Sequence, residues 1–277
     1  MSDCRALRRK ERTAMRKGVS QLVMPGKDLR QAMEAAASAG YQGFEVRLFA
    51  DGPMSPRAPE SEFRAARETA RDLGLEICSV VGGLPDGASL AAADDGARKL
   101  AVETTEVVLE RAAIMGADTM LVVPGSVSPE NRYDHVYERT LESLAALRPA
   151  AERIGVSLAV ENVWNKFLLS PLEARALVDA VGGPNVGFYF DVGNFVPWAY
   201  PEQWVEILGP RIKKVHFKDF RRRDYRFVPL TEGDVDWPRV MAALRSAGYD
   251  DYVISEVDGP DEMLKITSAT MDRILEM

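Results

Sequence analysis

"VSLAVEN", residues 156–162, begins as an apolar run typical of a buried strand and ends beside a carboxylate, Glu161. Two later runs behave in the same way, since "VGFYFD" closes on Asp191 and "YVISEV" carries Glu256 one residue before its end. Between them, "IKKVHF" carries His216 one residue before its end. Four consecutive predicted strands therefore each deliver one ionisable side chain close to their carboxyl end.

Short runs rich in β-branched and aromatic residues alternate with longer helical patterns along the whole chain. Helix signals punctuate the intervening segments: a helix begins near Asp28 and stops at Gly40, and Ser170 with Glu173 predicts a capping box. Eight strand–helix units in 277 residues give about 35 residues per unit, the size of a βα unit. The predicted strands are 18–23, 43–48, 75–81, 118–123, 156–161, 186–191, 212–217 and 252–257.

Two architectures can hold eight parallel strands of this length. A doubly wound open sheet is the rival, but the segment after the first strand, "QLVMPGKD" (21–28), has neither GxGxxG nor a P-loop lysine motif. A (β/α)8 TIM barrel needs about 250 residues, which this chain provides. We therefore predict an α/β fold, a single-domain barrel over 18–277, preceded by a basic extension over 1–17 that is disordered or an over-extended start.

Composition narrows the class of protein. The chain is 46% hydrophobic and 28% charged, as expected for a globular protein with a large core. Its net charge of −7 and pI near 5.1 argue against a nucleic-acid partner, which a basic face would attract. Two cysteines make neither a disulfide framework nor a zinc cluster, and no apolar run is long enough for a membrane span. We expect a cytoplasmic protein without a membrane partner.

The four strand ends suggest a metal site. In a parallel barrel, active sites gather at the carboxyl ends of the strands, so these side chains would converge there if each points inward. Three carboxylates without a cation would repel one another in a poorly solvated place. Three carboxylates and one imidazole suit Mn²⁺ best, with Mg²⁺ or Co²⁺ as alternatives. The competing interpretation is that each group is solvated or paired with a nearby Lys or Arg.

At these residues the chain resembles the xylose-isomerase-like TIM-barrel superfamily, in its sugar (phosphate) isomerase/epimerase branch with the ketose 3-epimerases and hydroxypyruvate isomerase. The resemblance covers nearly the whole chain after about residue 18. It is specific to the superfamily and much less so to one substrate. The motifs that carry it are "AVENVWNKFLLSP" (159–171), "FYFDVGN" (188–194), "VHFKDF" (215–220), "LTEGDVDW" (230–237) and "GYDDYVISEV" (248–257).

The resemblance implies a site and a reaction. In the ketose 3-epimerases a Mn²⁺-type ion is held by a Glu, an Asp, a His and a second Glu, and the two glutamates act as an acid/base pair. These match Glu161, Asp191, His216 and Glu256. Independently of the family, removal of a proton next to a carbonyl gives an enediolate whose charge a divalent ion can stabilise. Return of the proton on the opposite face gives epimerisation, and return to the neighbouring carbon gives isomerisation.

Further residues are candidates for substrate binding. Arg222 stands six residues beyond the histidine, where the family's arginine touches sugar hydroxyls. Lys218 lies two residues after His216, so both side chains would point to the same face of the strand. Trp164 could wall a sugar face, Asn194 takes the place of a substrate-contacting histidine of the epimerases, and Glu45 could orient a hydroxyl. The epimerases also carry a second glutamate where this chain has Phe167. Both departures weaken a free-ketose 3-epimerase assignment. They leave the substrate, a sugar or sugar phosphate, open.

Three functional hypotheses remain at this point. The first is a metal-dependent sugar isomerase or epimerase of carbohydrate metabolism, and the second is a dehydratase of a keto-polyol such as a keto-inositol. The third is a non-catalytic barrel subunit. An endonuclease IV type of DNA-repair enzyme is excluded because its three-metal site needs many histidines, whereas this chain has two, His135 and His216. Relatives often form dimers or tetramers, so a homodimer or homotetramer is possible.

Overall fold

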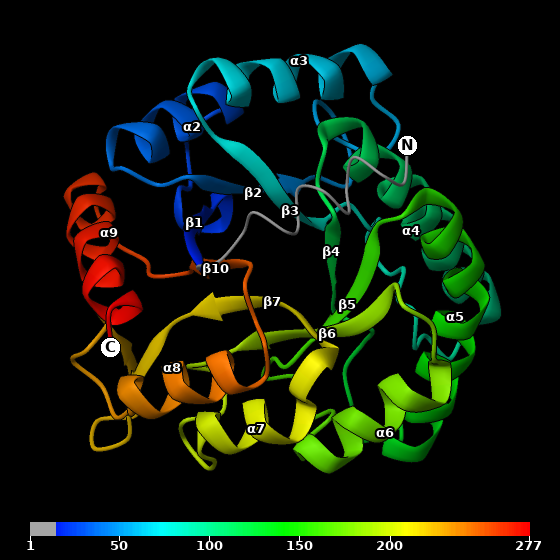
Figure 1. Cartoon of the computed structure of the whole chain (residues 1–277). Coiled ribbons are helices and arrows are strands. Elements are labelled where there is room, and N and C mark those ends of the chain that lie inside the picture. Colours follow the sequence, from blue (N-terminus) through cyan, green and yellow to red (C-terminus); the bar gives the residue numbers. More distant parts are fainter. Residues whose placement is uncertain (1–14) are drawn as a thin grey trace.

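Eight parallel strands close into a barrel that is surrounded by helices (Figure 1). The computed structural model describes residues 15–277, and around the barrel the strands follow the order β1-β10-β7-β6-β5-β4-β3-β2. The predicted (β/α)8 fold is confirmed, and each predicted strand coincides with an observed one to within three residues at either end. The barrel strands are β1 (Arg16–Ser20), β2 (Gly43–Leu48), β3 (Glu76–Gly82), β4 (Thr119–Val122), β5 (Ser157–Glu161), β6 (Val186–Asp191), β7 (Ile212–Phe217) and β10 (Tyr252–Ser255).

Helices connect the strands and pack outside them. Asp28 caps the first of them in a capping box with Gln31. The capping box predicted at Ser170 is wrong, because the Ser170 hydroxyl accepts from the Leu172 amide while Glu173 accepts from the Tyr133 hydroxyl at 2.5 Å. The helices are α2 (Leu29–Ser38), α3 (Glu60–Asp72), α4 (Asp95–Met115), α5 (Tyr133–Ile154), α6 (Pro171–Val181), α7 (Pro201–Leu208), α8 (Trp237–Ser246) and α9 (Asp261–Leu275), with short 3₁₀ turns η1 (Gln21–Val23) and η2 (Gly209–Arg211).

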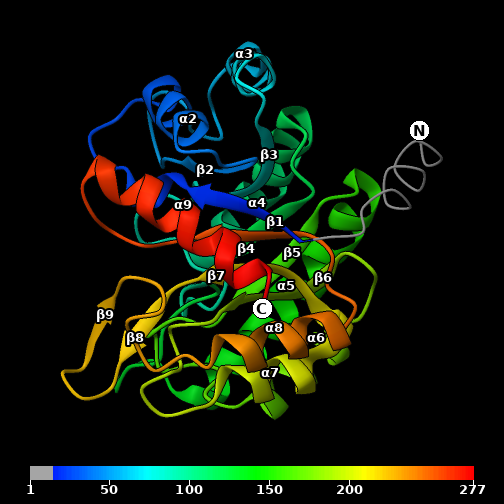
Figure 2. The same cartoon turned by 60° about the vertical axis from the view of Figure 1, so that its left-hand side comes forward.

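A two-stranded hairpin, absent from the sequence prediction, lies between β7 and α8. Its strands β8 (Asp219–Arg221) and β9 (Arg226–Val228) are antiparallel. Figure 2 shows the hairpin projecting on the side to which the β1 arrow points, which is the carboxyl end of the barrel. The Asp219 carboxylate fixes its base, since it accepts from the amides of Thr231, Gly233 and Val235 and from the Trp237 indole.

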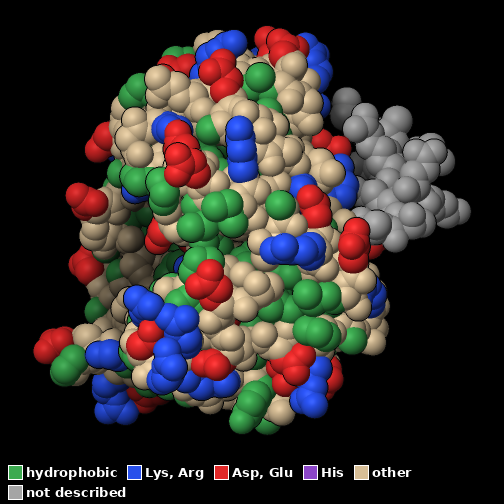
Figure 3. Space-filling model, turned by 90° about the vertical axis from the view of Figure 1, so that its left-hand side faces the viewer, with side chains coloured by type: hydrophobic (Ala, Val, Ile, Leu, Met, Phe, Trp, Pro, Cys, Tyr) green, Lys and Arg blue, Asp and Glu red, His purple; other side chains and the backbone are tan. Residues whose placement is uncertain are grey.

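The predicted basic extension over 1–17 falls mostly outside the described residues. Of its members, Met15, Arg16 and Lys17 are described, and Arg16 and Lys17 already belong to β1. The first strand thus begins two residues before the predicted boundary at 18. Over residues 15–277, no helix is both long and apolar enough to cross a membrane. The face drawn in Figure 3 mixes acidic, basic and apolar side chains, apart from one group of basic side chains low on its left.

The inside of the barrel is closed at one end. A small apolar cluster fills the barrel toward its amino-terminal end. It consists of Cys78, Leu121, Ala159, Tyr189, Tyr252 and Ile254. Below them the buried Lys214 ammonium lies 2.8 Å from Asp118 and 2.5 Å from Asp251, two residues that precede strands at their amino ends. Packed apolar side chains and these ion pairs fill the amino-terminal end. The carboxyl end is therefore left to hold the ionisable strand ends.

Replacing Gly43 by alanine tests this packing. A Cβ at Gly43 would lie 2.5 Å from the Tyr252 ring and 3.1 Å from the Cys78 sulfur, so extra volume there forces neighbours apart. Overpacking of this kind should lower the free energy of unfolding by about 1–3 kcal/mol, measured by denaturant titration. In a Tyr252→Leu protein, Gly43→Ala should lower the free energy of unfolding by less, because the tyrosine ring that the new methyl group would contact is absent. A Gly43→Ala variant as stable as the parent would contradict the packing described.

Candidate metal centre and active site

Four side chains from adjacent strands converge in the barrel mouth. Each offers one ligand atom, and these atoms all lie within 4.8 Å of one another. Asp191 and His216 are fully buried, and Glu161 and Glu256 retain only 7% and 16% of their side-chain exposure. The two glutamates are thus the members of the set that keep some exposure. The set consists of the four predicted ligands, Glu161, Asp191, His216 and Glu256.

Asp191 is held by its surroundings with one oxygen left over. Its Oδ1 accepts from the amides of Gly193 and Asn194 at 2.8 and 2.7 Å. Asn162 brackets its backbone, accepting from the Asp191 amide at 2.8 Å and donating to its carbonyl at 2.9 Å. The buried Oδ2 has no hydrogen-bond partner in the structure. An orphaned carboxylate oxygen is costly unless a cation satisfies it, so this atom fits a metal ligand.

The His216 ring presents its two nitrogens to different groups. Nδ1 faces the carboxylates, 3.0 Å from Glu161, 3.7 Å from Glu256 and 3.9 Å from Asp191. Nε2 lies 3.1 Å from an oxygen of Glu45. Burial alone would lower the pKa of His216, but Glu45 and Glu256 beside it raise it well above its ordinary value. In the neutral form that binds a metal, the contact with Glu45 would keep the proton on Nε2 and leave Nδ1 for a divalent cation.

Glu45 is completely buried and its oxygens have protein partners. One oxygen faces His216, and the other accepts from the hydroxyls of Ser79 and Tyr189. Burial alone would raise the pKa of Glu45, but the neighbouring His216 charge and these hydrogen bonds lower it to about 2. The sequence suggested that Glu45 orients a substrate hydroxyl. The structure instead places its carboxylate against the imidazole, inside the barrel.

The charges in the mouth are out of balance. Lys218 lies 2.5 Å from Glu256 and 3.7 Å from Asp191, so one ammonium lies beside two of the three carboxylates of the set. Counting only these three carboxylates and Lys218, three negative charges and one positive charge leave −2. Burial raises the pKa of Glu161 to about 7 and that of Asp191 to about 6. Carboxyl groups that resist ionisation together, yet are arranged around one point, fit a divalent cation.

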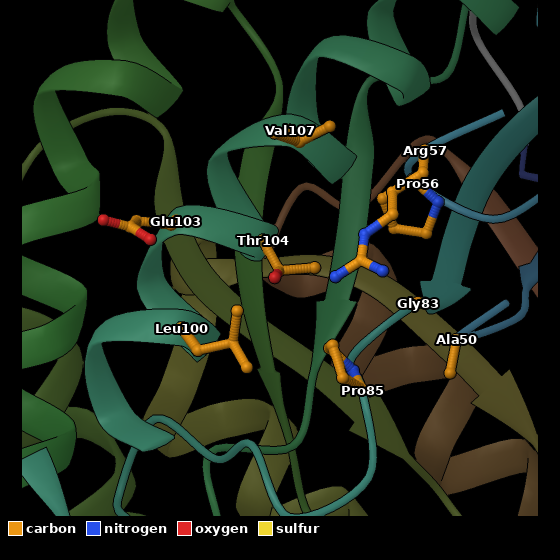
Figure 4. A pocket seen from close by; sticks show the side chains of 9 residues that line it. All are labelled: Ala50, Pro56, Arg57, Gly83, Pro85, Leu100, Glu103, Thr104 and Val107. Atoms are coloured by element: carbon orange, nitrogen blue, oxygen red, sulfur yellow. The ribbon is translucent and has the colours of Figure 1, made fainter. Parts of the chain in front are cut away.

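A cavity of about 350 Å³ occupies the other half of the mouth. Arg47, Val81, Val123 and Asp86, from the carboxyl ends of β2–β4 and the loop after β3, are among its lining residues. The ligands come from β5, β6, β7 and the residue after β10, so the cavity and the ligand set divide the mouth between them. A second cavity of about 190 Å³ lies beside α4, where Arg57 reaches toward Thr104 and Glu103 points away (Figure 4).

The remaining predicted substrate residues lie on the rim close to the ligands. Trp164 is half exposed, and its indole donates to the Asn194 carbonyl at 2.6 Å. Asn194 is buried, and its side chain donates to the Asn162 carbonyl. Arg222 donates to the carbonyls of Val196 and Ala199. The predicted substrate contacts of these residues and of Lys218 stay predictions.

Sequence reasoning missed several supporting residues. Tyr189 and Ser79 lie in predicted strands but were not singled out, yet the hydroxyls of both donate to Glu45. Asn162, directly after Glu161, extends the pairing of β5 and β6 beyond the last ladder residue. A polar residue on the inward parity of a barrel strand was the available signal for Ser79 and Tyr189.

Metal binding by the purified, chelator-treated protein tests the ligand set. We expect one equivalent of Mn²⁺ to bind in isothermal titration calorimetry. His216→Asn should weaken it by more than about 100-fold, since loss of an outer partner alone costs about 10–100-fold. His135→Asn is the matched control, because His135 lies exposed on α5 and should leave the affinity unchanged. Equal Mn²⁺ affinity of both histidine variants would remove His216 from the site.

Glu45→Gln tests the support of His216. The amide keeps the shape of Glu45 but loses the charge that holds the imidazole, so the Mn²⁺ affinity should fall by about 10–100-fold. Glu76→Gln, an exposed carboxylate on β3, should not change it. Wild-type affinity in the Glu45→Gln protein would show that the contact with His216 does not help to position the ring.

Comparisons with known proteins agree with this fold. A family model described as "Xylose isomerase-like TIM barrel" matches residues 33–276. An uncharacterized protein of Methanocaldococcus jannaschii is 26% identical over 251 residues, which cover 87% of this chain and 83% of that protein. L-ribulose-5-phosphate 3-epimerase UlaE of Escherichia coli is 26% identical over 161 residues, 58% of this chain and 57% of that protein. A crystal structure of D-psicose 3-epimerase, determined in the presence of D-fructose, superimposes with a TM-score of 0.80 at 19% identity, covering 95% of this chain and all of that one. Because the family model spans most of the sequence, this chain belongs to the xylose isomerase-like TIM-barrel family.

Proposed function

We propose that this protein is a divalent-metal-dependent sugar or sugar-phosphate isomerase or epimerase. The observation that carries the proposal is the convergence of three carboxylates and one imidazole in the barrel mouth, with a buried Asp191 oxygen that accepts no hydrogen bond. Sugar epimerases among the relatives and structural neighbours support the same class of reaction. The sugar on which this protein acts is left open, since the match to the L-ribulose-5-phosphate 3-epimerase covers only 57% of that enzyme's length.

The metal would be held by Glu161, Asp191, His216 through Nδ1, and Glu256. This donor set is mostly hard oxygen, which favours Mn²⁺, with Mg²⁺ and Co²⁺ as alternatives. When bound, such an ion supplies Lewis-acid stabilisation of the negative charge that develops on the substrate oxygen during deprotonation. Lys218, at 2.5 Å from Glu256, adds a fixed positive charge beside the same carboxylates.

Glu161 and Glu256 are assigned as the acid/base pair. They are the two ligand carboxylates with remaining exposure, and they approach from β5 and from the end of β10, with His216 of β7 between them in the barrel order. One of them removes the proton next to the carbonyl, and the other returns a proton to the opposite face.

The substrate would extend from these glutamates into the cavity at the carboxyl ends of β2–β4. Lys218 could donate to a hydroxyl, and Trp164 could cover one face of the sugar. The exposed Arg47 at the cavity wall would suit a phosphate group, which keeps sugar phosphates within the proposal. Arg222 and Asn194, whose side chains donate to backbone carbonyls, would act mainly by fixing the rim.

Exchange of substrate hydrogen with solvent tests the reaction. In D₂O with Mn²⁺, a panel of ketoses, aldoses and their phosphates should show deuterium entering the carbon next to the carbonyl, read by NMR. Glu161→Gln and Glu256→Gln should each slow exchange by about 10²–10⁴-fold, the usual contribution of a general acid or base. Metal content is measured in parallel, because both residues are also assigned as ligands. Glu262→Gln, an exposed residue in the first turn of α9, is the control.

The mass of the product separates epimerisation from elimination. An isomerase or epimerase leaves the substrate mass unchanged, whereas a dehydratase of a keto-polyol loses one water after the same deprotonation. A panel in which every compound binds yet none exchanges or loses water, with Mn²⁺ bound, would contradict proton abstraction and favour a non-catalytic role.

A further inference from the structure

Four exposed aromatic side chains stand on the rim beside the ligand set; we call them the aromatic platform. Each is between 40% and 60% exposed. They come from the loops after β5 and β6 and from the β8–β9 hairpin, all at the carboxyl end of the barrel. A contiguous apolar surface of this kind on a soluble protein usually marks a binding site. The platform consists of Trp164, Trp198, Tyr225 and Phe227.

The platform is one connected surface with Trp164 at its centre. Phe227 stacks on Trp164 with ring centroids 5.2 Å apart, and Tyr225 lies 5.9 Å from Trp164 on the hairpin side. Trp198 extends the surface 6.1 Å in centroid distance from Trp164. Beneath it, the buried Phe220 contacts three of the four rings at 5.2–5.8 Å. The exposed rings therefore rest on a core residue.

The protein fixes the platform before any ligand arrives. The Trp164 indole is tied to the Asn194 carbonyl, and Arg222 ties the hairpin to the loop after β6 through Val196 and Ala199. Tyr225 is held at a φ of 50°, a left-handed conformation that is uncommon for a bulky residue. Such strain persists only where surrounding contacts impose it, and it concentrates at functional sites.

The platform is continuous with the catalytic carboxylates. The Lys218 ammonium lies 2.5 Å from Glu256 and 4.8 Å from the centre of the Phe227 ring, so it touches both. From Phe227 the surface continues through Trp164 to Trp198, two further ring-to-ring steps of 5.2 and 6.1 Å. A single sugar whose reacting carbons lie at the carboxylates can cover only the nearer rings. The farther rings need another group.

The chemistry of the platform fits a second sugar ring. A pyranose presents an apolar C–H face, which packs on aromatic rings, and a hydroxyl edge, which needs polar partners. Beside Tyr225, the Asp224 carboxylate lies 2.8 Å from both Arg221 and Arg226, which supplies donors and acceptors at the platform edge. We propose that the substrate is a glycoside, with its reacting keto-sugar at the carboxylates and a second ring on the platform. This inference rests on the proposed function, which places the reacting sugar.

Binding of glucosylated fructoses tests the inference without turnover. The probes are isomaltulose, turanose and leucrose, each compared with fructose by isothermal titration calorimetry of the Mn²⁺-loaded protein. At least one disaccharide should bind about tenfold more tightly than fructose. Trp198→Ala and Tyr225→Ala should each weaken that disaccharide by about three- to tenfold while changing fructose binding less than twofold. Ile266→Ala, which changes a similarly exposed apolar side chain on α9 outside the platform, should leave both affinities unchanged.

Three results would overturn the inference. The first is no preference for any disaccharide over fructose, and the second is equal weakening of disaccharide and fructose in the platform variants. The third is a platform buried between two copies, seen as a dimer in sedimentation that Trp198→Ala or Tyr225→Ala converts to monomer. A platform-dependent preference without any deuterium exchange would instead uphold the inference and overturn the proposed reaction, so the two failures are distinguishable.

Discussion

The contact between Glu45, His216 and Glu161 is the interaction on which the rest of the site depends. One imidazole lies between two buried carboxylates, 3.1 Å from the first and 3.0 Å from the second. Because Glu45 holds Nε2, the ring cannot turn, and Nδ1 is directed at the three ligand carboxylates. Burial of this charge cluster is tolerable only when every oxygen has a partner, which is why Ser79 and Tyr189 complete the shell of Glu45.

The barrel separates stability from chemistry along its axis. At the amino end, Lys214 is paired with Asp118 and Asp251, and Tyr252 fills the space left by Gly43. At the carboxyl end, carboxylates that are more deeply buried are not fully paired by protein cations. Lys218 neutralises one of three negative charges, and the buried Asp191 oxygen has no hydrogen-bond partner. The charged side chains at the amino end of the barrel are thus paired with one another, whereas those at the carboxyl end keep an excess of negative charge that suits a cation.

Two departures from the epimerase pattern have structural consequences. Where those enzymes carry a second glutamate, Phe167 is buried against Tyr133 and Tyr137, and so strengthens the core under α5. Where they carry a histidine, Asn194 uses its amide to hold Asp191 and its side chain to hold Asn162. The Phe167 side chain is therefore apolar and the Asn194 side chain is engaged with the protein. The rings of Trp164 and Phe227, close to the same carboxylates, stay exposed.

The sequence by itself determined the barrel and the four residues of the candidate metal site. Strand runs that carry Glu161, Asp191, His216 and Glu256 at their last or next-to-last position follow from local alternation, and parallel strands bring their carboxyl ends together whatever the loops do. Only the tertiary structure decided what surrounds them. Glu45 and Ser79 pair with residues more than 100 positions away, the β8–β9 hairpin is too short for a periodic signal, and the platform joins three separate loops. Contacts that depend on which loops meet in space leave no local pattern, because each residue alone looks like an ordinary surface aromatic or core polar group.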